Sequence, residues 1–62
     1  MSDKIKINGR TIYYGRFTSL ETARNCANRT AAYSVMMGNA GQYWVARMVD
    51  CERMNKAGYE WA

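Results

Sequence analysis

The pair Asn8-Gly9 constrains the fold of this chain more than any other feature of its sequence. Asn-Gly is the preferred dipeptide of a two-residue type I′ turn, in which both central residues have positive φ. Such a short loop allows one register for the flanking strands, because Ile7 then lies opposite Arg10 and each further pair follows. The sequence therefore predicts an antiparallel β-hairpin that begins at Lys4 and ends at Phe17.

The alternation of side chains along these strands divides the hairpin into two faces. The apolar face, which we expect to be core, carries Ile5, Ile7, Ile12 and Tyr14. The opposite face is basic and aromatic and carries Lys4, Lys6, Thr11 and Tyr13. We expect this second face to be in contact with water.

A helix is predicted directly after the hairpin. The stretch Thr18-Ser19-Leu20-Glu21 fits a capping box with Thr18 as the N-cap. The apolar positions that recur at helical spacing, and would lie on the sheet, are Leu20, Ala23 and Ala27. Cys26 lies close to this stripe and is expected to be a small buried side chain. The helix should end within 28–30.

A second hairpin is predicted over 32–49, with Gly38-Asn39-Ala40-Gly41 as a four-residue loop. This loop places Met37 opposite Gln42 and Val35 opposite Trp44. The face expected to be core is free of charge and carries Tyr33, Val35, Met37, Trp44, Ala46 and Met48. The other, mixed face carries Ser34, Met36, Tyr43, Val45, Arg47 and Val49.

A short C-terminal helix is predicted over 51–57. Asp50 suits its N-cap, Val49 and Met54 suit a hydrophobic staple, and Gly58 suits the position after its end. Trp61, in the tail, is expected to pack back on the fold. The order is therefore ββαββα in one small α+β domain over 1–62. We expect an antiparallel sheet of about four strands, with one main helix on one face.

Composition limits the chemistry available to the chain. The 62 residues include no His and two Cys, Cys26 and Cys51, which cannot complete a tetrahedral zinc site alone, so we expect no metal and no cofactor. No signal peptide or membrane-spanning run is visible. We therefore expect a cytoplasmic protein with free thiols and no membrane partner.

The sequence predicts a protein without enzymatic activity. It lacks His, the commonest general base. Glu21 and Asp50 are explained as capping residues. Cys51 is the one candidate nucleophile, because a thiol in the first turn of a helix can have a lowered pKa. It has no nearby base in the sequence and no resolving Cys at C-x-x-C spacing.

One helix layer would leave one face of the sheet open for a partner. The candidate partner-binding residues on that face are Lys4, Lys6, Tyr13, Met36, Tyr43, Val45 and Arg47. Exposed apolar and aromatic side chains favour a protein contact. The net charge of +4 favours polyanions, and nucleic-acid binding would require a continuous cationic surface. That surface would include Lys4, Lys6, Arg10, Arg16 and Arg47.

Two resemblances bear on this choice. Residues 8–27 resemble the latter part of the plant ethylene-response-type DNA-binding domain, through Gly9-Arg10, Tyr13, Gly15, Phe17, Thr18, Ala23 and Ala27. This resemblance covers about a third of the chain and implies a sheet that enters the DNA major groove. The first strand of that family, with its Arg and Trp readers, has no counterpart before Lys4. The segment GQYWVARMV resembles that strand but follows the helix.

The chain as a whole resembles the small accessory proteins of bacteriophages and mobile elements, many of which cap or block a host protein. We therefore interpret it as a small non-enzymatic binding protein of the host cytoplasm, with a protein partner that it inhibits or adapts as the first hypothesis. A DNA- or RNA-binding module that uses the same face is the alternative, and a homodimer stays open.

Overall fold

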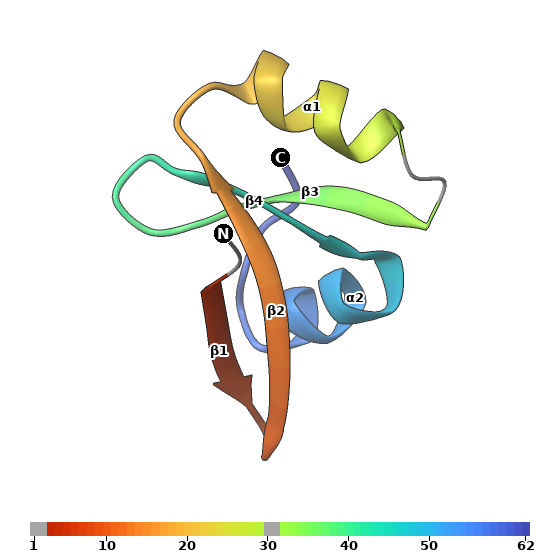
Figure 1. Ribbon diagram of the computed structural model, residues 1–62. Coiled ribbons are helices and arrows are strands. Elements are labelled where there is room, and N and C mark those ends of the chain that lie inside the picture. Colours follow the sequence, from red (N-terminus) through yellow and green to blue (C-terminus); the bar gives the residue numbers. More distant parts are fainter. Residues whose placement is uncertain (1–2, 30–31) are drawn as a thin grey trace.

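The computed structural model describes residues 3–29 and 32–62 and confirms the α+β order ββαββα (Figure 1). Its elements are β1 (Asp3–Ile7), β2 (Arg10–Phe17), α1 (Leu20–Asn28), β3 (Tyr33–Met37), β4 (Tyr43–Arg47) and α2 (Met48–Lys56). The four strands form one antiparallel sheet in the order β1-β2-β4-β3. The long strand β2 joins the two hairpins, because its first five residues pair with β1 and its last three residues pair with β4.

The first hairpin has the predicted turn and register. Asn8 and Gly9 have φ values of 49° and 81°, so both occupy the left-handed region that a type I′ turn requires. Ile7 pairs with Arg10, and Lys4 pairs with Tyr13.

The second hairpin differs from the prediction by one residue. Tyr43, not Gln42, lies opposite Met37. The Gln42 N–H donates to the Asn39 carbonyl at 3.1 Å, and the Gly38 N–H donates to the Gln42 carbonyl at 2.8 Å. Gly38 and Asn39 therefore both face Gln42, which is the two-against-one pattern of a β-bulge.

This shift changes which side chains of β3 and β4 share a face. Val35 lies opposite Val45, whereas Met36 lies opposite Trp44 on the other face. The predicted core face was wrong at three positions, because Tyr33, Met37 and Met48 are exposed.

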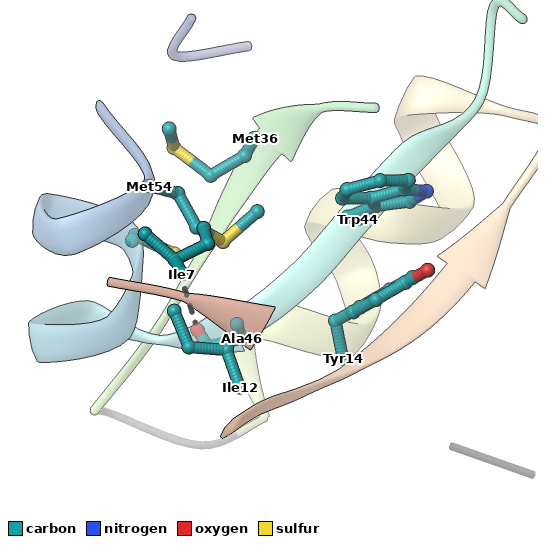
Figure 2. Packing of buried hydrophobic residues seen from close by; sticks show 8 residues of the cluster. Ile7, Ile12, Tyr14, Met36, Trp44, Ala46 and Met54 are labelled. Carbon is teal, nitrogen blue, oxygen red and sulfur yellow. Dashed lines mark hydrogen bonds between the residues drawn. The ribbon is translucent and has the colours of Figure 1, made fainter. Parts of the chain in front are cut away.

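The two helices lie on opposite faces of the β3–β4 hairpin, α1 on one side and α2 on the other (Figure 1). The smaller core lies under α1 and contains Ala23, Ala27, Val35 and Val45. The larger core lies on the α2 side and contains Ile7, Ile12, Tyr14, Met36, Trp44, Ala46, Cys51 and Met54 (Figure 2). Both faces of β3 and β4 are therefore covered.

Helix α1 begins one residue later than predicted. Ser19, not Thr18, is its N-cap, and the Ser19 hydroxyl accepts from the Thr22 N–H at 3.5 Å. The predicted capping box is therefore wrong. Ala23 and Ala27 are buried as expected, whereas Cys26 is exposed because it lies beside the apolar stripe rather than within it. The helix ends at Asn28, and residue 30 lies outside the described residues.

Helix α2 begins three residues earlier than predicted, at Met48, and its N-cap Arg47 makes no side-chain capping bond. Asp50 is therefore not an N-cap but a buried residue in the first turn. The helix ends at Lys56, one residue before the predicted end, and Gly58 follows the C-cap Ala57 with a φ of 108°, in the predicted position after the helix. The Gly58 N–H donates to the Asn55 carbonyl and the Tyr59 N–H to the Met54 carbonyl, which together form a Schellman motif.

The C-terminal tail adds a short segment to the outer edge of β3. The Met37 N–H donates to the Glu60 carbonyl at 2.8 Å, and the Ala62 N–H donates to the Val35 carbonyl at 3.2 Å. Trp61 thus packs back through its backbone, which bridges to Met36. Its side chain stays partly exposed.

Candidate binding surface

The α1 side of the first hairpin carries an uncovered surface that we call the basic hairpin face. It consists of Lys4, Lys6, Thr11 and Tyr13, all of which are exposed. Tyr13 is the most prominent member, with 61% of its surface exposed. Lys4 lies directly opposite Tyr13 in the ladder and Lys6 lies diagonally to it, so both cations share this face with Tyr13.

The opposite face of the hairpin holds these side chains in place, because it is anchored in the larger core. Ile12 is buried, and the ring of Tyr14 stacks on Trp44 with 4.1 Å between the ring centroids (Figure 2). Since side chains alternate along a strand, burial of Ile12 and Tyr14 directs Thr11 and Tyr13 to solvent.

The apolar part of the predicted binding surface is not available to a partner. Met36 has no exposed surface and Val45 has 4%, and the two side chains belong to different cores on opposite faces of the sheet. Tyr43 is half-buried against the smaller core. The expectation of one open, mixed face was wrong because the bulge shifts the register of β3 and because α2 covers the second face.

Arg47 is exposed but takes part in an ion-pair network at the start of α2. Its Nε lies 3.6 Å from Oδ2 of the buried Asp50, whose Oδ1 lies 3.1 Å from Nη1 of Arg53. Asp50 therefore holds two guanidinium groups on either side of its carboxylate. Such partly exposed pairs contribute little stability, about 1 kcal/mol or less each, but they restrict where the Arg side chains lie.

The five cations proposed for a nucleic-acid surface do not share one face. Lys4, Lys6 and Arg47 lie on the α1 side, whereas alternation places Arg10 and Arg16 on the α2 side. Arg16 pairs with Asp3. Three of the five cations make no salt bridge to any described residue, namely Lys4, Lys6 and Arg10.

Two further cations near the hairpin were missed in the sequence. Arg53 and Lys56 of α2 line a pocket together with Arg10 at the tip of the hairpin. Their spacing of three residues indicates a shared helix face. The contact between this helix face and the hairpin results from tertiary packing, and no local sequence pattern predicts it.

The two cysteines are free and lie in contrasting environments. Cys51 is fully buried, and its thiol contacts the carbonyl oxygens of Ala46 at 3.5 Å and Ser34 at 3.7 Å. Burial raises the pKa of the Cys51 thiol, and the carboxylate of Asp50 adds to the rise. The first-turn position therefore does not activate this thiol, since the neutral form dominates at neutral pH.

Among residues 3–29 and 32–62, no group of three or more His, Cys, Asp or Glu side chains is arranged to hold a metal ion. Neither α1 nor α2 is long and apolar enough to cross a membrane. The comparisons with known proteins found no family model, no curated protein and no solved structure that matches the chain.

Proposed function

We propose that the protein is a small non-enzymatic binding module whose basic hairpin face contacts a nucleic acid. The observation that carries this proposal is the exposed Tyr13 ring, with Lys4 opposite and Lys6 diagonal to it, on the face of the first hairpin that points away from the larger core. Residues 4–20 contain four cations and no acidic side chain, so no charge of their own opposes a phosphate backbone. A two-stranded ribbon of this kind fits the major groove of a duplex, and an exposed Tyr can stack on an unpaired base.

A protein partner that the chain inhibits or adapts is the second candidate, and a separate observation favours it. Tyr33, Met48 and Val49 are all exposed where β3 begins and α2 begins. Tyr33 lies opposite Arg47 in the ladder, and the Met48 N–H donates to the Ala32 carbonyl, so these residues are neighbours. Tyr, Met and Arg are enriched at protein interfaces. This cluster would supply the apolar contacts that the buried Met36 and Val45 cannot.

Salt dependence distinguishes the two candidates. A face that neutralises about two phosphates should lose about tenfold in affinity between 50 and 200 mM salt, whereas an apolar contact should change little. The experiment measures binding of a fluorescent 20-base-pair duplex, and of the matching single strand, at several salt concentrations. The double variant Lys4→Ala/Lys6→Ala should flatten the salt slope by about 2 units.

Arg24 and Arg29 provide a matched control, because both are exposed cations on or next to α1. The double variant Arg24→Ala/Arg29→Ala removes the same charge from another surface and should keep most of the slope. Equal losses in the two double variants would indicate attraction by net charge alone. Absence of binding to either nucleic acid at 50 mM salt would leave the protein partner as the better candidate.

A further inference from the structure

The tip of the first hairpin and the end of α2 enclose a small cationic pocket on the side opposite the basic hairpin face. Its volume is about 200 Å³, and it is lined by Ile7, Asn8, Arg10, Arg53 and Lys56. Three of these five residues are cations and none is acidic. They come from two elements that are far apart in the sequence, so the pocket exists only in the folded chain.

The core holds the two walls of the pocket against each other. Ile7 is buried in the larger core together with Met54 of α2, so the hairpin tip rests on the helix (Figure 2). Arg10 follows the turn directly and pairs with Ile7 in the ladder. Arg53 and Lys56, three residues apart on α2, are neighbours on the helix surface.

Arg53 is oriented within this pocket by its ion pair. Its Nη1 donates to Oδ1 of Asp50 at 3.1 Å, and Asp50 is buried. A guanidinium has five N–H donors, so one bond to Asp50 leaves the others for a ligand. Asp50 also offsets part of the positive charge, but it lies 3.6 Å from Arg47 as well. The pocket therefore keeps a positive charge.

We propose that this pocket is an oxyanion site that takes a single phosphate group. Planar guanidinium groups match the tetrahedral oxygens of a phosphate, and three cations suit a doubly charged anion better than a carboxylate. The volume lies below the range of about 300–1,000 Å³ typical of sites for drug-sized ligands, which suits one phosphate group.

The phosphate can come from two sources, free inorganic phosphate or the backbone of a nucleic acid. The second source rests on the proposed function. In that case the hairpin contacts phosphates from both of its faces, through Lys4 and Lys6 on one side and through the pocket on the other. The pocket would then increase the salt dependence of nucleic-acid binding, although it is not part of the basic hairpin face.

The test uses the full chain and two probes, inorganic phosphate and a 20-base-pair duplex. Phosphate is titrated while the backbone amide signals of Asn8, Arg10, Arg53 and Lys56 are followed by NMR. We expect saturable shifts that Arg10→Ala and Lys56→Ala each weaken by about fivefold or more, whereas Arg24→Ala and Lys4→Ala change them by less than about twofold. Both pocket variants alter exposed side chains, and thermal unfolding checks that they stay folded.

The duplex arm separates this proposal from the proposed function. Arg10→Ala and Lys56→Ala should each reduce the salt slope by about 1 unit if the pocket holds a backbone phosphate. Saturable phosphate binding without duplex binding would support the pocket and contradict the proposed function. Phosphate shifts that do not saturate, or that are the same in wild type and both variants, would overturn the pocket even if the duplex binds.

Discussion

The β1–β2 and β3–β4 hairpins use the same turn conformation, but only the first has the residue pair that predicts it. The central residues Asn8 and Gly9 have φ values of 49° and 81°, and Ala40 and Gly41 have values of 55° and 74°. Asn tolerates the left-handed region, whereas Ala rarely adopts it. An Ala-Gly pair therefore does not predict a two-residue turn, and the sequence of 38–41 predicts a four-residue loop instead.

The second hairpin also contains a bulge that the first lacks. Two residues, Gly38 and Asn39, face Gln42, which shifts every later pair by one position. Gly38 lies against the indole of Trp44, and a Cβ at this position would overlap that ring. Because the side-chain period of a strand is two, a shift of one residue exchanges the faces of β3. The register set by this turn therefore places Met36, and not Met37, on the face that α2 covers.

The two hairpins also differ in how many of their faces are covered. The first has one solvent-exposed face, and the side chains of β1 accordingly alternate between Lys and Ile. The second lies between two helices, and strand β4 contains the nearly continuous apolar run Tyr43-Trp44-Val45-Ala46. Such runs are typical of strands that are buried on both faces. The solvent-exposed face of the first hairpin is therefore the better place for a polar contact with a partner.

The largest expected effect tests the register of the second hairpin. Met36→Ala should lower the free energy of unfolding by about 2–5 kcal/mol, because it removes a fully buried side chain and leaves a cavity. A chain of this length has a total stability of about 3–9 kcal/mol, so this variant can be largely unfolded. Urea unfolding followed by circular dichroism measures the change.

The neighbouring Met37, which is 43% exposed, is the matched control. Met37→Ala should cost less than about 1 kcal/mol, and the conservative Met36→Leu should cost less than about 1.5 kcal/mol. The reverse ranking, with Met37→Ala the more damaging, would restore a register in which Met37 is core.

The next effect tests the turn of the first hairpin. Gly9→Val should lower the free energy of unfolding by about 1–3 kcal/mol, because a β-branched residue is strained at a φ of 81°. Beyond Asn8 and Arg10, no atom lies within 4 Å of the position that a Cβ would take, so the loss is conformational rather than a clash. Gly9→Asn should cost less, since Asn tolerates positive φ. Equal melting temperatures for the two variants would contradict a strained turn.

The parts of the fold that were predictable are those with a local cause. The Asn8-Gly9 pair determines the first register, and Gly58 determines the end of α2. The start of α2 was not predictable from its cap residues, because Asp50 forms ion pairs inside the first turn instead of capping it. Ser19 and Thr18 are both good N-caps, and the choice between them depends on where β2 ends.

The candidate site was predictable only where it depends on the first hairpin. Lys4, Lys6 and Tyr13 share an exposed face, as the two-residue turn requires. The burial of Met36 and Val45 follows from a bulge that the Ala-Gly pair does not indicate, and from two helix layers whose packing on the sheet is nonlocal. The gathering of Arg53 and Lys56 around the hairpin tip has the same nonlocal origin, so no spacing in the sequence indicates it.

The smallest expected effect asks whether the two turns are energetically equivalent. Ala40→Asn would give the second hairpin the Asn-Gly pair of the first. We expect this change to raise the free energy of unfolding by about 0.5–1 kcal/mol, because Asn adopts a φ near 55° with less strain than Ala. The position is exposed, so the longer side chain extends into solvent.

Ala40→Val is the control of opposite sign, since a branched side chain increases the strain. The measurement is the shift of the urea midpoint at an unchanged m value, because a change in m would indicate an altered unfolded state instead. A destabilised Ala40→Asn protein would show that the bulge, and not the pair of left-handed residues, governs the conformation of this loop.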